Sequence, residues 1–126
     1  KSRSRGLGDV YKRQSINSIR GVKNMLAYAT SKSAIVSFTA SLALDLSKHN
    51  IRVNAVAPGA IDTPMLASFK KDLTSKEYQK RMRDNHPIGR IGKPEEVASV
   101  IYFLASEASS FMTGLTIPVD GGRSIR

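Results

Sequence analysis

Residues 26–59 read LAYATSKSAIVSFTASLALDLSKHNIRVNAVAPG, and this stretch decides the fold. Its first part is rich in small and helix-forming residues, which predicts a long helix from Leu26 to Lys48. The expected apolar stripe of that helix consists of Ile35, Phe38, Leu42 and Leu46. The next run, Ile51 to Ala57, predicts a strand that ends at Pro58 and Gly59.

The alternation of strand and helix continues on both sides of this stretch. Upstream, Ser15 to Ile19 is expected to be the end of a strand. Downstream we expect a basic helix over Thr74 to Asn85, a helix that begins at Pro94, and a last strand over Leu115 to Val119. Pro118 cannot donate a ladder hydrogen bond, so this last strand should lie at a sheet edge. Strands separated by helices pair in parallel, which predicts an α/β fold with right-handed crossovers.

Tyr28 and Lys32 are four residues apart on the long helix, so both side chains should lie on one helix face. Free tyrosine titrates near pH ~10, too high to exchange protons at neutral pH. An adjacent ammonium group stabilises the phenolate form, and Tyr28 could then act as a general acid or base. Taken alone, the pair also fits an ordinary surface helix.

Three further motifs follow the pair in order. They are NAVAPGAIDTP at 54–64, PIGRIGKPEE at 87–96 and VDGG at 119–122. Together with Tyr28 and Lys32 they resemble the C-terminal half of a short-chain dehydrogenase/reductase, over Ser15 to Gly122. The resemblance implies the C-terminal portion of a Rossmann-like, doubly wound parallel sheet, and an NAD- or NADP-dependent oxidoreductase that interconverts a carbonyl group and a secondary alcohol.

The resemblance also implies a role for each site residue. Tyr28 would be the general acid or base, and Lys32 would assist it and bind the nicotinamide ribose. The remaining cofactor contacts would be made by Pro58, Gly59, the Ile61 backbone and the Thr63 hydroxyl, with Gly59 leaving room for the nicotinamide. Without the tyrosine motif, Pro58-Gly59 fits a plain turn at the end of a strand equally well.

A serine that holds the substrate oxygen is implied as well, and two residues could supply it. The family places this serine thirteen residues before the tyrosine, which is the position of Ser15. Ser18 stands ten residues before Tyr28, in a Ser-Ile-Arg-Gly context similar to that of the family. We interpret Ser18 as the catalytic serine, with a loop shortened by three residues, and keep Ser15 as the alternative.

The first fourteen residues have a different interpretation. Residues 4–14 read SRGLGDVYKRQ, which matches the translation of a transposase-type sequencing adapter. We therefore expect residues 1–14 to be an artefact rather than a domain, and residues 15–126 to be a partial catalytic domain. The Gly-rich turn and pyrophosphate-binding helix of the family are not in this sequence, so we expect the 126-residue chain alone to be inactive.

Charge and composition bear on three other kinds of function: nucleic-acid binding, metal binding and a place in the membrane. The formal net charge is +10, of which +4 lies in residues 1–14, and the basic helix Thr74 to Asn85 could meet an anionic partner. No nucleic-acid motif accompanies it, so we expect a solvated face and no nucleic-acid partner. There is no cysteine, the histidines His49 and His86 lack metal-ligand spacing, and no apolar run reaches membrane-span length. His49 and His86 are expected at the surface or at helix ends.

We therefore expect a cytoplasmic enzyme without a metal, whose partners are a small carbonyl or alcohol substrate and copies of itself. The small-residue helix and the last strand resemble the surfaces through which the family forms homodimers and homotetramers. A non-catalytic relative that serves in binding or assembly is the alternative. Sugars, steroids and acyl-thioester ketones all remain possible substrates.

Overall fold

The computed structural model describes residues 10–13, 26–64, 66 and 75–125. Within these residues the framework consists of three helices and three strands. In chain order they are β1 (Val10–Arg13), α1 (Leu26–Ser47), β2 (Val53–Pro58), α3 (Ser75–Asn85), α4 (Pro94–Ala105) and β3 (Thr116–Val119), with short 3₁₀ turns η2 (Glu107–Ser109) and η3 (Arg123–Ile125). The helices and strands that were predicted within 26–125 are all present.

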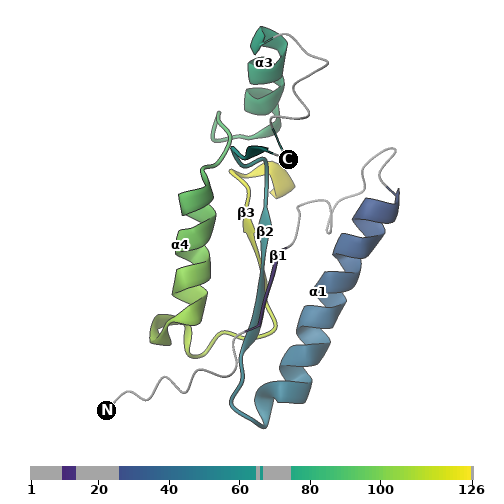
Figure 1. Ribbon diagram of the computed structural model, residues 1–126, viewed down its shortest axis with the longest axis vertical. Helices are drawn as coiled ribbons and strands as arrows, with labels where there is room; N and C mark the ends of the chain where they lie inside the picture. Colours follow the sequence, from purple (N-terminus) through teal and green to yellow (C-terminus); the bar gives the residue numbers. More distant parts are fainter. Residues whose placement is uncertain (1–9, 14–25, 65, 67–74, 126) are drawn as a thin grey trace.

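The strands form one parallel sheet in the order β1-β2-β3. Val10 pairs with Val53 and Ala55 pairs with Thr116, so β2 is central. Helix α1 lies on one side of the sheet and α4 on the other, which gives three layers (Figure 1). This arrangement confirms the α/β class, and it confirms that the last strand, with Pro118, lies at an edge.

The central strand explains why the sheet must be covered on both faces. Residues Val53 to Ala57 are all buried, as expected for a parallel strand with helices on either side. On the α4 side, Val56, Val97 and Leu104 form the buried cluster. Leu104 is completely buried, which contributes about 1.5–3 kcal/mol relative to an exposed leucine.

Helix α1 partly buries Ile35, Leu42 and Leu46 of the expected stripe, but Phe38 departs from it. Thr39 and Ala43 are its buried residues, whereas Phe38 of the expected stripe is 48% exposed. Small side chains allow the helix to approach β2, and the Thr39 hydroxyl is satisfied because it donates to the Ile35 carbonyl at 2.7 Å. The prediction for Phe38 was therefore wrong.

The end of α1 sets the start of β2. Asn50 has a φ of 57°, the left-handed conformation that often follows a helix, and the Ile51 N–H still bonds the Leu46 carbonyl at 3.4 Å. The chain becomes a strand only at Val53, two residues later than the apolar pattern indicated.

Arg52, just before β2, ties the sheet to the far end of α4. Its guanidinium donates to the Leu104 carbonyl at 2.8 Å, the Ser109 hydroxyl at 3.0 Å, and the carbonyls of Met112 and Ser106 at 3.3 and 3.4 Å. A positive charge near carbonyl groups at a helix C-terminus is favourable in itself. Asn54 adds a second tie, donating to the Met112 carbonyl and accepting from the Leu115 N–H.

Strand β1 falls within the segment that matches a sequencing adapter. Its four residues pair in parallel with β2 from Val53 to Val56. Parallel pairing uses backbone groups, so it does not depend on the identity of the side chains. The strand end expected over Ser15 to Ile19 lies outside the described residues, and so does Ser18.

Candidate active site

The site is built where β2 ends and α1 begins. Helix α1 runs antiparallel to β2, so the first turn of α1 and the carboxyl end of β2 lie at the same end of the molecule (Figure 1). Ligands in open parallel sheets bind beyond the carboxyl ends of the strands. The first turn carries Tyr28, and the strand continues into Gly59 and the loop that leads to Thr63.

Tyr28 and Lys32 face each other as their spacing predicted. The Lys32 Nζ lies 5.5 Å from the centroid of the Tyr28 ring, within the range of a cation–π contact. Tyr28 is 42% exposed, so its phenol can reach a ligand from solvent, whereas Lys32 is half-buried.

In the loop after β2, the backbone N–H and carbonyl groups of Ile61 point away from its bridge partner, Gly92. Ile61 forms an isolated parallel bridge with Gly92. In this bridge the Asp62 N–H bonds the Gly92 carbonyl at 2.9 Å, and the Gly92 N–H bonds the Ala60 carbonyl at 2.9 Å. Because the flanking residues make these bonds, the peptide groups of Ile61 itself point to the opposite side. This edge fits the contact with a carboxamide that was expected of Ile61.

Thr63 fits the same contact through its hydroxyl group. Its Oγ1 accepts from the Leu66 N–H at 3.4 Å, and the residue is half-buried. A hydroxyl that accepts one bond retains its own proton for donation. Thr63 can therefore hold the loop and donate to a ligand oxygen.

Gly59 is required by packing within the protein. A Cβ at this position would lie 2.9 Å from the Asp120 Cα, and the Gly59 N–H bonds the Val119 carbonyl at 3.1 Å. A backbone atom cannot give way as a flexible side chain can. Within the protein, the missing side chain leaves room for the end of β3. The nicotinamide contact that the resemblance implies for Gly59 stays a prediction.

Asp120 shapes the turn that follows β3. Its Oδ1 accepts from the Gly122 N–H at 3.0 Å and its Oδ2 from the Ser124 N–H at 2.7 Å. Gly121 and Gly122 have φ values of 60° and 84°, which a residue with a side chain adopts only under strain. The VDGG motif is therefore a rigid turn packed against the start of the loop.

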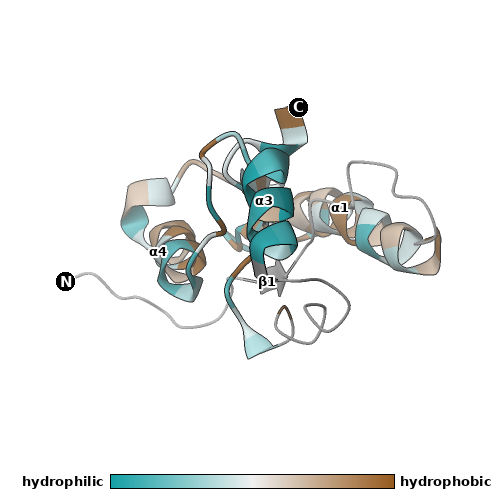
Figure 2. Ribbon diagram, turned by 90° about the horizontal axis from the view of Figure 1, so that it is seen from above, coloured by the Kyte–Doolittle hydropathy of each residue, from teal (hydrophilic) through white to brown (hydrophobic). Residues whose placement is uncertain are grey.

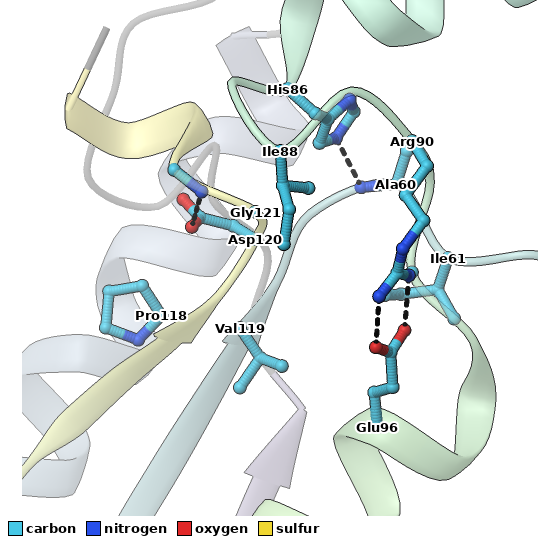
Figure 3. Close-up of a pocket in the computed structure, with 12 residues that line it drawn as sticks. Ala60, Ile61, His86, Ile88, Arg90, Glu96, Pro118, Val119, Asp120 and Gly121 are labelled. Atoms are coloured by element: carbon cyan, nitrogen blue, oxygen red, sulfur yellow. Dashed lines mark hydrogen bonds and ion pairs between the residues drawn. The ribbon is translucent and has the colours of Figure 1, made fainter.

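His86 is a member of the site that the sequence interpretation missed. It follows α3 directly, as a helix-end residue should, but it is only 1% exposed rather than at the surface. Its Nε2 accepts from the Ala60 N–H at 3.2 Å (Figure 3). Its Nδ1 lies 2.7 Å from the Met82 carbonyl. Among the described residues, no three His, Cys, Asp or Glu side chains are grouped closely enough to hold a metal ion.

A hollow of about 380 Å³ at the carboxyl ends of β2 and β3 is lined by Ala60, Ile61, His86 and the turn at residues 120–122, among others. Tyr28, Lys32 and Thr63 are not among its lining residues. Arg90 and Glu96 form a two-bond ion pair on its rim, at 2.7 and 2.8 Å (Figure 3). The bond from Arg90, followed by one from the Lys93 N–H, lowers the pKa of Glu96 to about 2. Glu96 thereby also caps the first turn of α4.

Helix α3 is linked electrostatically to the loop as well. Tyr78, on α3, is 7% exposed. Burial raises the pKa of Tyr78 above its ordinary value of 10, and the negative charge of Asp62 raises it further. Asp62 lies in the loop after β2, so the charge of this loop acts on a side chain of α3.

Comparison with known proteins finds similarity to a reductase family. A family model described as enoyl-(acyl carrier protein) reductase matches residues 2–124. Protein FixR of Bradyrhizobium diazoefficiens is 46% identical over 99 residues, which cover 79% of this chain and 33% of that protein. The 3-oxoacyl-[acyl-carrier-protein] reductase FabG of Aquifex aeolicus is 41% identical over 115 residues, 91% of this chain and 44% of that protein.

Solved structures show the same similarity. An F189W variant of actinorhodin polyketide ketoreductase with NADPH superposes with a TM-score of 0.88 at 32% identity, over 94% of this chain and 48% of that one. A 7α-hydroxysteroid dehydrogenase with NADH gives 0.82 at 36% identity, over 91% and 44%. The chain thus spans less than half the length of each of these proteins.

Proposed function

This chain belongs to the short-chain dehydrogenase/reductase family, and we propose that it supplies the catalytic tyrosine and the nicotinamide-binding loop of an NAD- or NADP-dependent oxidoreductase. The reaction is the interconversion of a carbonyl group and a secondary alcohol. The observation that carries the proposal is the placement of Tyr28 with Lys32 at the same end of the sheet as the outward peptide edge of Ile61.

Each residue has a task that its geometry supports. Tyr28 donates a proton to the carbonyl oxygen during reduction and accepts it back during oxidation. Lys32, beside the ring, assists the tyrosine and binds the ribose. The Ile61 peptide and the Thr63 hydroxyl hold the carboxamide, beside Pro58 and Gly59. The bound nicotinamide supplies the hydride. The test is ketone-dependent oxidation of NADH or NADPH by the full-length protein that carries this segment.

The serine that orients the substrate oxygen is Ser18 or Ser15. Both residues lie outside the described part of the chain. Ser18 is the proposed residue, because its Ser-Ile-Arg-Gly context resembles that of the family, and Ser15 is the alternative. Separate replacement of each serine by alanine in the full-length protein distinguishes them, since only the catalytic one should reduce turnover strongly.

Replacement of Thr63 by valine tests the nicotinamide contact. Valine keeps the shape of threonine and removes the hydroxyl, so the affinity for NADH or NADPH should fall by about one hydrogen bond, ~0.5–1.5 kcal/mol. The measurement is a fluorescence titration of the reduced nucleotide with the full-length protein. An unchanged dissociation constant would show that this segment is merely a turn.

We further propose that the full-length protein is a homodimer or homotetramer. The outward face of α1 carries Ser33, Ser37, Ser41 and Asp45, all exposed, and a row of small residues allows a second helix to approach closely. Ser37→Arg places a bulky charge on this row and should lower the molar mass measured by light scattering. The same mass before and after the change, or a monomer at the outset, would reject this interface.

The residues of helix α3 fit a solvent-exposed surface better than a nucleic-acid-binding surface. Helix α3 is hydrophilic over most of its surface (Figure 2), and the acidic Glu77 and Asp84 interrupt its basic residues. A non-catalytic binding or assembly role is the second candidate. It predicts nucleotide binding without turnover, so the turnover assay separates it from the first. Within the described residues, no helix has the length and apolar character needed to cross a membrane.

A further inference from the structure

We propose that His86 is a positioning residue for the nicotinamide-binding loop, which it fixes to helix α3 through one neutral tautomer of its imidazole ring. The inference rests on the proposed function of that loop. It begins from the position of His86, which is 1% exposed and spans two elements distant in sequence, α3 and the loop after β2.

The two partners determine which ring nitrogen carries the proton. The Met82 carbonyl can only accept, so Nδ1, 2.7 Å away, must donate to it. The Ala60 N–H can only donate, so Nε2, at 3.2 Å, must accept. The ring is therefore neutral with its proton on Nδ1. Any change that moves the proton to Nε2 breaks the bond to Ala60.

The bond to Ala60 holds the loop at its central point. Gly59 is fixed by β3 through the Val119 carbonyl, and Ile61 is fixed by its bridge to Gly92. Ala60 lies between them and is buried, with its N–H directed at the imidazole (Figure 3). A buried N–H that loses its acceptor must move to find another. Movement of Ala60 would turn the peptide of Ile61, which is the group proposed to hold the carboxamide.

The backbone segment that carries His86 is held in place by hydrogen bonds and by the VDGG turn. The Gly89 N–H bonds the His86 carbonyl at 2.7 Å, and the Ile88 N–H bonds the Gly121 carbonyl at 3.2 Å. A Cβ on Gly121 would lie 2.7 Å from the Ile88 Cγ2 and 3.7 Å from the His86 Cβ. The rigid VDGG turn thus supports the segment that presents the imidazole. This support fits a role of His86 in orienting the loop better than a role in filling space.

Two conservative replacements separate the two bonds. The amide of glutamine reaches the position of Nε2, so His86→Gln keeps an acceptor for the Ala60 N–H. The amide of asparagine reaches only the position of Nδ1, so His86→Asn keeps the bond to Met82 and loses the one to Ala60. In the full-length protein, His86→Asn should weaken the binding of NADH or NADPH about tenfold, while His86→Gln stays within about threefold of the original.

Hydrogen exchange provides a readout that does not need the nucleotide. The Ala60 amide should exchange at least about tenfold faster in His86→Asn than in His86→Gln. Arg52→Ala is the control for general destabilisation. It acts at the opposite end of β2 and should leave nucleotide affinity unchanged.

Equal nucleotide affinity and equal Ala60 exchange in the two His86 variants would overturn the inference. Equal losses in His86→Asn and Arg52→Ala would also overturn it, because the effect would then follow stability alone. A full-length protein that binds neither nucleotide would contradict the proposed function instead, and faster Ala60 exchange in His86→Asn would still support the fixation of the loop by His86.

Discussion

Replacement of Tyr28 by phenylalanine should reduce ketone turnover by the full-length protein by about 10²-fold or more, the usual contribution of a positioned general acid. Phenylalanine keeps the ring under the Lys32 ammonium and removes only the hydroxyl group. The cation–π contact therefore survives, and affinity for the nucleotide should change little. Steady-state rates and nucleotide titrations measure the two effects separately.

A matched control lies on α4. Tyr102→Phe removes a hydroxyl from a tyrosine that is 78% exposed on α4, away from the start of α1, and should leave turnover unchanged. Turnover of Tyr28→Phe within tenfold of the original would contradict the role of Tyr28. Loss of nucleotide binding together with turnover would indicate that the hydroxyl serves the cofactor more than the chemistry.

Arg52→Ala should have the largest effect on stability, a loss of about 2–3 kcal/mol in the free energy of unfolding, because hydrogen bonds to a charged group are worth more than neutral ones. The guanidinium reaches four acceptors at the end of α4 and in the following turn. Alanine leaves the Leu104 carbonyl and the other acceptors without that donor. Urea unfolding of the full-length protein measures the change through the midpoint and slope.

Two controls accompany this change. Arg52→Lys keeps the charge near the helix end but cannot reproduce the planar fork, so it should recover only part of the loss. Arg81→Ala removes an exposed arginine from α3 and should change the free energy of unfolding by no more than about 0.5 kcal/mol. A loss for Arg52→Ala as small as that for Arg81→Ala would show that water replaces the guanidinium without cost.

The sequence was sufficient for features that depend on local pattern. The helix from Leu26 and the helix from Pro94 begin at the predicted residues, because helix formers and the Pro-Glu-Glu start act within one turn. The facing of Tyr28 and Lys32 follows from the helical repeat alone. The edge position of the last strand follows from the missing N–H of Pro118.

Features set by partners distant in sequence could not be predicted. His86 appears polar in the sequence, and its burial depends on the Ala60 N–H, which is 26 residues away. The need for Gly59 arises from Asp120, at the end of another strand. Phe38 appeared to belong to the core because the direction of the sheet relative to α1 is not encoded in the helical repeat.

Transfer of deuterium from the nucleotide tests the central claim most directly. The full-length protein is incubated with NADH or NADPH that carries two deuterium atoms at C4 of the nicotinamide, and with a 3-oxoacyl thioester, a keto sugar or a ketosteroid. We predict deuterium on the carbinol carbon of one of these products, in an amount equal to the oxidised nucleotide, and about 10²-fold slower formation of that product after Tyr28→Phe. A carbinol hydrogen that comes from solvent, or nucleotide that stays reduced with every ketone, would contradict hydride transfer by this protein.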